Sequence, residues 1–139
     1  MRIMAIDYGA AHTGIAISDP TGFLAGYTTT IDAYRAEVVA DRICALVKEY
    51  GVEELVLGYP KNMDGSLGPR AEKAEAMAEL VKSVTSLPVI LWDERRTTID
   101  AHQNLFNSGK NAKKRKKTVD AVAASLILEG YLTFKRSHS

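Results

Sequence analysis

The chain opens with MRIMAIDYGAAHTGIAISD over residues 1–19, two short apolar runs separated by a glycine-containing turn. The first run, residues 2–7, ends in Asp7, and the second, Ile15–Ser18, begins after Gly9–Gly14. Apolar runs of this length between turn residues are typical of buried β-strands. We therefore expect a tight hairpin whose first strand ends in a carboxylate, a natural place to hold a divalent cation.

The segments that follow first continue this β pattern and then change to helical spacing. Asp-Pro-Thr-Gly at 19–22 is a strong turn signal before a third strand, 23–31, which is rich in Thr and aromatic residues. The spacing of the later apolar residues predicts strands at 54–57 and 88–92, and helices at 34–50, from 69 to about 84, at 99–106 and from about 118 to 134.

This order of elements predicts one α/β domain spanning residues 1–139. Three strands in an antiparallel meander, followed by βα crossovers, give a five-stranded mixed sheet with helices on both faces. The first three strands are antiparallel and the later ones are parallel additions. We see no internal repeat and no linker that would mark a second domain.

The composition is typical of a soluble globular protein, with 46% hydrophobic and 25% charged residues. No apolar stretch reaches the length of a membrane span, and the N-terminus lacks a signal-peptide pattern. The single cysteine, Cys44, excludes an internal disulfide and fits a reducing compartment. We therefore expect a cytoplasmic protein that has no membrane partner.

Positive charge is concentrated in one segment. Residues 110–117 carry six Lys or Arg and no acid; the net charge is +1, so the rest of the chain carries −5. Such a cluster is either a solvated loop or a contact for a polyanion. Because it directly precedes Asp120, we expect a phosphate-binding loop beside the functional site. Its contacts would be made without reading sequence, by Lys113, Lys114, Arg115 and Lys116.

Acidic residues occur at the ends of three separate predicted elements. Asp7 ends the first strand, Glu94 follows the fifth and Asp120 lies near the start of the last helix. Convergence of these three acids on metal ions would explain why each lies at the end of an element. Simpler roles remain open: an N-cap or turn residue for Asp7, an ion pair with Arg95 or Arg96 for Glu94, and a helix-dipole partner for Asp120. Asp93 is the rival acid beside Glu94.

Four motifs, in order and over nearly the whole chain, resemble the YqgF family, also called RuvX, of the ribonuclease-H-like superfamily. They are Ile6–Gly9 with Gly14–Asp19, Leu57–Ser66, Asp93–Arg95 with Thr97-Thr98, and Lys114–Lys117 leading to Asp120. The resemblance implies a ribonuclease-H-like fold and a nuclease that matures the 5′ end of precursor 16S ribosomal RNA. It also implies that the acidic positions of the site are Asp7, Glu94 and Asp120.

Hydrolysis of a phosphodiester requires an activated water and stabilisation of charge on phosphorus and on the leaving oxygen. Two Mg²⁺ or Mn²⁺ ions about 3.5–4 Å apart supply both, and hard cations prefer oxygen ligands. We expect Asp7 to bridge the two ions, and Glu94 and Asp120 to hold one each. The expected substrate is nucleic acid, either structured RNA or branched DNA, with ribosomal precursor particles as a further partner.

Residues in the middle of the chain are candidates for substrate contact. Lys61, Asn62 and Arg70 surround a polar loop that is suited to follow a phosphate backbone. The first turn is less basic than in many family members, since Ala10–Thr13 contains no Lys or Arg between the two glycines. Its backbone N–H groups remain available for phosphate.

The sequence leaves three alternatives to an RNA-processing nuclease. A Holliday junction resolvase must cut two strands symmetrically and would therefore act as a two-fold dimer. A non-catalytic factor would bind nucleic acid with the same basic segment. An actin-like ATPase or sugar kinase also uses a strand-Asp-x-Gly turn, but it needs a second lobe to close over the nucleotide. The sequence does not identify a dimer surface, so the oligomeric state is left open.

Overall fold

The computed structural model describes residues 1–22, 24–60, 64–93 and 112–137. The chain order is β1 (Ile3–Asp7), β2 (His12–Ser18), β3 (Ala25–Asp32), α1 (Ala36–Tyr50), β4 (Glu54–Tyr59), α2 (Pro69–Thr85), β5 (Val89–Asp93) and α4 (Ala112–Ser137). Within these ranges no helix is both long and apolar enough to cross a membrane.

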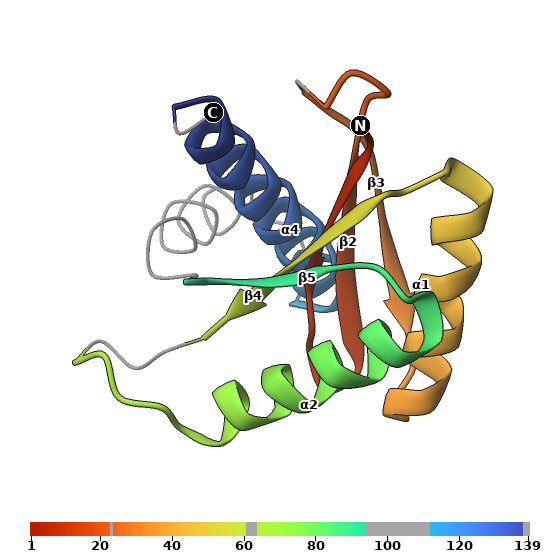
Figure 1. Cartoon of the computed structure of the whole chain (residues 1–139). Helices are drawn as coiled ribbons and strands as arrows, with labels where there is room; N and C mark the ends of the chain where they lie inside the picture. Colours follow the sequence, from red (N-terminus) through yellow and green to blue (C-terminus); the bar gives the residue numbers. More distant parts are fainter. Residues whose placement is uncertain (23, 61–63, 94–111, 138–139) are drawn as a thin grey trace.

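The strands form one sheet in the order β3-β2-β1-β4-β5, with β1 at its centre (Figure 1). The β1–β2 and β2–β3 pairs are antiparallel, whereas β4 runs parallel to β1 and β5 runs parallel to β4. The predicted mixed sheet is therefore confirmed. Because β1, β4 and β5 share one direction, their carboxyl ends lie at the same edge, where α/β folds commonly bind ligands.

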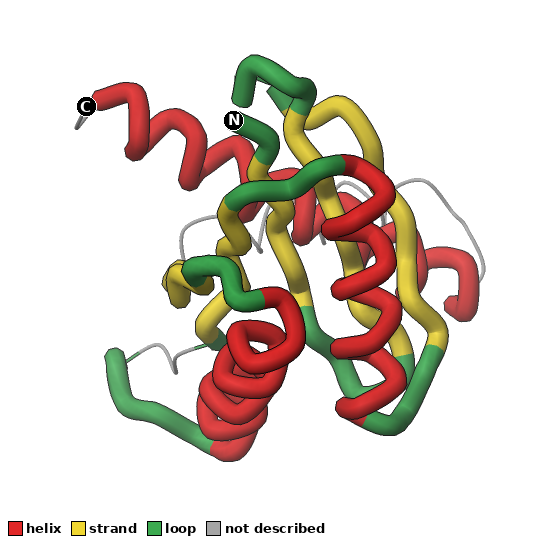
Figure 2. The backbone as a smooth tube through the Cα atoms, turned by 45° about the vertical axis from the view of Figure 1, so that its right-hand side comes forward, coloured by secondary structure: helices red, strands yellow, loops and turns green. Residues whose placement is uncertain are grey.

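Helices cover both faces of the sheet, as Figure 2 shows. Met4 and Ile6 of β1 belong to the core on the side of α1 and α2. Ile3 and Ala5 belong to the core under α4, which lies across β1, β2, β3 and β4. This alternation follows from the two-residue period of a strand and fixes the side to which each later β1 residue points.

Backbone chemistry sets the ends of α1 and α2. The helix α1 ends at Gly51, which has a φ of 68°, a left-handed conformation that favours glycine after a helix. The helix α2 has Pro69 in its first turn, where the missing N–H has no cost, and its carboxyl end lies next to Ser86. Both helices lie close to their predicted bounds.

Two predicted boundaries were wrong. The helix α4 begins at Ala112 rather than near 118, so the backbone of the basic segment from Lys113 is helical and is no loop. Ala, Lys and Arg are strong helix formers, and their charge masked this preference in the sequence pattern. The strand β2 begins at His12, because pairing with β3 extends it from Gly14 back through Thr13 to His12. The predicted helix at 99–106 lies outside the described residues.

Candidate active site

Asp7 lies at the carboxyl edge of the sheet, as the last residue of its central strand. It pairs in register with Gly14 of β2 and is half-buried. Because Ile3 and Ala5 face α4, alternation along β1 places Asp7 on that same face. Tyr8, the next residue, packs against the opposite core. The carboxylate of Asp7, which we expect to bind metal, is thus on the α4 side of the edge.

The turn after Asp7 is too tight for any side chain at Gly9. A Cβ atom there would lie 2.3 Å from the carbonyl oxygen of His12. The turn is also tied to β3: the N–H of Ala33 donates to the oxygen of Ala11 at 3.1 Å, and His12 Nδ1 lies 2.8 Å from Asp32 Oδ1. These contacts hold the backbone around Asp7 in place.

The helix α4 crosses the sheet obliquely, with its last turns at the amino end of β1 and its earlier turns toward the carboxyl edge (Figures 1 and 2). Near its end, Lys135 Nζ lies 2.9 Å from Glu54 Oε2 and 3.6 Å from the sulfur of Met1, both at the amino ends of parallel strands. Position 120 therefore lies toward the edge that carries Asp7.

Aromatic packing and a buried polar contact fix this orientation of α4. Trp92 of β5 makes edge-to-face contacts with Tyr131 and Phe134, at ring-centroid distances of 5.8 and 5.6 Å. The hydroxyl of Tyr131 donates to Glu54 at 3.0 Å. Burial, followed by this hydrogen bond to a carboxylate, raises the pKa of Tyr131 to about 12. The helix cannot slide along the sheet without breaking these contacts.

Asp93 lies on the other face of the sheet from Asp7. Trp92 belongs to the core under α4, so alternation along β5 directs Asp93 toward the α2 side. Val89, two pleats earlier on the same side, packs against the α1 and α2 core. An acid at this position is poorly placed to share a metal ion with Asp7.

The structure describes some of the predicted site residues fully, some only by their backbone and others not at all. Glu94, Lys61 and Asn62 lie outside the described residues. Asp120 and the basic residues from Lys113 to Lys116 are placed by the α4 backbone alone. Among the described residues, no group of three or more His, Cys, Asp or Glu is close enough to hold a metal ion. Convergence of the three acids is therefore untested.

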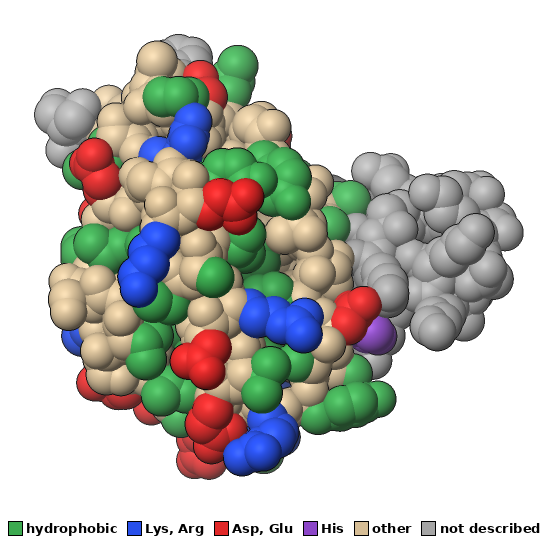
Figure 3. Space-filling view, turned by 90° about the vertical axis from the view of Figure 1, so that its right-hand side faces the viewer, with side chains coloured by type: hydrophobic (Ala, Val, Ile, Leu, Met, Phe, Trp, Pro, Cys, Tyr) green, Lys and Arg blue, Asp and Glu red, His purple; other side chains and the backbone are tan. Residues whose placement is uncertain are grey.

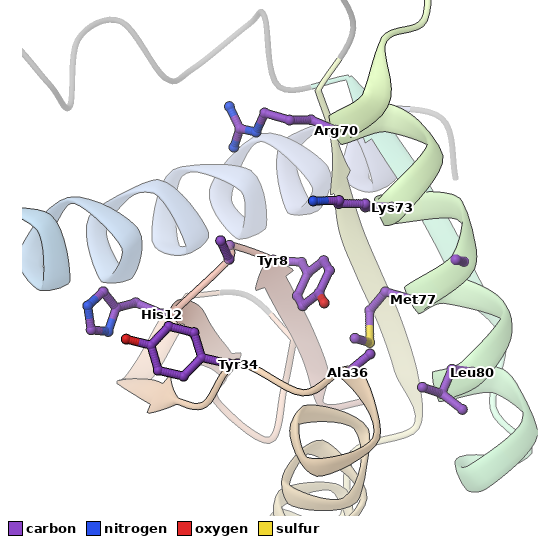
Figure 4. A pocket seen from close by; sticks show the side chains of 11 residues that line it. Tyr8, His12, Tyr34, Ala36, Arg70, Lys73, Met77 and Leu80 are labelled. Atoms are coloured by element: carbon purple, nitrogen blue, oxygen red, sulfur yellow. The ribbon is translucent and has the colours of Figure 1, made fainter.

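Arg70 lies in the first turn of α2 and lines a pocket of about 740 Å³. The pocket opens between α2, the β1–β2 turn and the start of α1 (Figure 4). The sequence analysis did not single out most of the other residues of this pocket. The pocket side chains that matter most are Tyr8, His12, Tyr34, Arg70, Lys73 and Met77.

Tyr59 ends β4 at the same edge, and its half-buried side chain packs against the core on the side of α2. Its hydroxyl donates to Glu75 of α2. This hydrogen bond is the main cause of the raised pKa of Tyr59. The side chain therefore joins β4 to α2, the helix that carries Arg70 and Lys73.

The described surface has no broad basic area on the side of α1. Figure 3 shows acidic and basic side chains interspersed over that face.

The fold is shared with a solved structure. The structure "T. thermophilus RuvC in complex with Holliday junction substrate" matches with a TM-score of 0.64 over 100% of this chain and 98% of that chain, at 13% identity. At such low identity the match concerns the fold alone. It confirms the predicted ribonuclease-H-like architecture.

Sequence comparison identifies the family. A protein of Listeria monocytogenes serotype 4b (strain CLIP80459), named "Putative pre-16S rRNA nuclease", is 47% identical over 134 residues, covering 95% of this chain and 97% of the relative. A protein of the same name from Geobacillus kaustophilus (strain HTA426) is 44% identical over 138 residues, covering 98% and 100%. Residues 1–134 match the RuvX family, described as "Holliday junction resolvase". The chain belongs to the RuvX family.

Proposed function

We propose that this protein is a metal-dependent nuclease that processes the 5′ end of precursor 16S rRNA in the cytoplasm. The observation that carries the proposal is the position of Asp7, at the carboxyl edge of the central strand and on the face toward which α4 directs position 120. Two relatives that are 47% and 44% identical over almost their whole length bear the name "Putative pre-16S rRNA nuclease". Family membership also favours a nuclease over a kinase or an ATPase.

The proposed ligands are Asp7, Glu94 and Asp120, with two Mg²⁺ or Mn²⁺ ions as the cofactor. The donor set fits hard cations, since all three ligands are carboxylates. A bound pair of such ions activates water and neutralises charge on the phosphate. The half-buried Asp7, next to a turn held by hydrogen bonds, is suited to keep its carboxylate in one orientation. We assign the second acid to Glu94 because Asp93 lies on the opposite face.

The proposed substrate contacts are phosphate contacts. Lys113, Lys114, Arg115 and Lys116 lie in the first turns of α4, before position 120, and Lys61 and Asn62 lie between β4 and α2. Several cations neutralising the backbone would give strong, salt-dependent and sequence-independent binding. Selection of the 5′ end of the precursor then depends on RNA structure or on a ribosomal particle.

The proposal is tested by comparing two substrates. Purified protein with Mg²⁺ is mixed in turn with a labelled 5′-extended precursor 16S rRNA fragment and with a four-way DNA junction, while the mass of the active species is measured. We expect one defined cut in the RNA and little cleavage of the junction. Paired symmetric nicks in the junction by a dimer would instead support the resolvase that the family description names. Tight binding of both substrates without cleavage would support a non-catalytic nucleic-acid-binding factor instead.

A further inference from the structure

The pocket beside the β1–β2 turn combines two cations with an apolar floor. Arg70 and Lys73 extend from α2 toward the turn, above Met77 and Ala36 (Figure 4). Tyr34 lies on the opposite side, and 82% of its surface is exposed. A pocket of about 740 Å³ is within the usual range for sites that take a small molecule or a part of a larger one.

The two cations do not stabilise the helix that carries them. Arg70 and Lys73 are three residues apart in the first two turns of α2, so they repel each other. They also lie at the positive end of the helix dipole, where cations are unfavourable. Across the described parts of the chain, neither side chain forms an ion pair. Their charge is therefore available for an anion.

The other pocket residues suit a flat aromatic group. Tyr8 and Tyr34 offer ring faces, and Met77 is a flexible apolar contact. Bases of single-stranded nucleic acid stack on such rings whatever their sequence, while nearby cations hold the phosphates. Met77 is 1% exposed, so the floor of the pocket is part of the rigid core.

From this geometry we propose that the pocket binds one unpaired nucleotide of an RNA strand, with its base against Tyr34 and Tyr8 and its phosphate between Arg70 and Lys73. The inference rests on the proposed nuclease function and adds a binding subsite to it. Asp7 and Tyr8 are adjacent in the chain but point to opposite faces of the sheet edge. A strand that crosses the edge can place its scissile phosphate at Asp7 and its neighbouring nucleotide in the pocket.

This arrangement requires the nucleotide to be unstacked, so the protein should prefer single-stranded RNA next to the cut. The test measures the affinity of fluorescent single-stranded and fully duplex RNA of equal length, with EDTA present to prevent cleavage. We expect the single strand to bind more tightly. Tyr34→Ala should weaken its binding about ten-fold. Tyr34→Phe, which keeps the ring, should bind as the wild type does.

Lys73, one of the two pocket cations, has a matched control residue in the same helix. Lys73→Ala should weaken single-strand binding several-fold and lower the salt dependence by about one phosphate contact. Lys82→Ala removes the same charge near the other end of α2, where Lys82 lies 4.0 Å from Glu79, and should leave the affinity unchanged. Both lysines are exposed, so neither change should affect folding.

The outcomes separate this inference from the proposed function. If the wild type and both pocket variants bind single strands equally, or if duplex RNA binds as tightly as the single strand, the pocket assignment is wrong, even where Mg²⁺-dependent cleavage is seen. If the variants lose binding as expected but the wild type cuts no RNA in any metal, the nucleotide pocket stands and the nuclease proposal fails.

Discussion

Asp7→Asn should lower the single-turnover rate of RNA cleavage by about 10³-fold, equivalent to about 4 kcal/mol of transition-state stabilisation. The change keeps the size of the side chain but removes the negative charge that we propose would hold the metal ions. Asp7 ends the central strand and pairs in register with Gly14, so the strand should tolerate the amide. The measurement is the rate with saturating enzyme in Mg²⁺.

Two controls show whether the Asp7→Asn variant loses catalysis alone or also loses folding or RNA binding. The thermal unfolding temperature should change little, because Asp7 lies at the edge of the sheet and not within either core. RNA affinity in EDTA should also be retained, since the proposed phosphate contacts are elsewhere. A variant that unfolds would show a structural role for Asp7, and a fully active variant would exclude it as a metal ligand.

Glu94→Gln should lower the same rate by about 10²–10³-fold, whereas Asp93→Asn should leave it within about three-fold of the wild type. The two residues are adjacent and make a matched pair. The reason for the difference is the pleat of β5: Trp92 packs under α4, and Asp93 is therefore directed to the α2 side, away from the face of Asp7. Both variants are measured in the same single-turnover assay.

The reverse result would change the assignment. If Asp93→Asn abolished cleavage while Glu94→Gln did not, the site would have to lie on the α2 side of the edge, next to the pocket. Loss of activity in both variants would indicate that the end of β5 matters as a unit. Neither result would alter the fold.

Much of the fold could be predicted because each element carries a local signal. The apolar run before Asp7 and the turn signal at 19–22 specified the meander, and the change to helical spacing after residue 34 specified the crossovers. The start of α4 was missed because the run of positive charge suggested a solvated loop. The helix propensity of the same residues is only a weak preference and did not outweigh that signal. Lys and Arg are common in solvated loops and are also good helix formers.

The candidate site was predictable only in part, for a different reason. Asp7 could be proposed because it ends an apolar run, and Arg70 because it flanks a polar loop. Tyr34 and Lys73 have no such signal, since they meet at the pocket only when α1 and α2 pack on the same face of the sheet. Their spacing in the sequence reveals nothing until the sheet order brings both helices to the turn after β1.

The central claim is that carboxylates at this edge of the sheet hold metal ions that cleave RNA. The most direct measurement is the metal dependence of cleavage of the 5′-extended precursor fragment by the wild-type protein. We expect no cleavage in EDTA and one defined cut when Mg²⁺ or Mn²⁺ is restored. Cleavage that persists in EDTA, or bound RNA that stays intact in every metal, would contradict the claim.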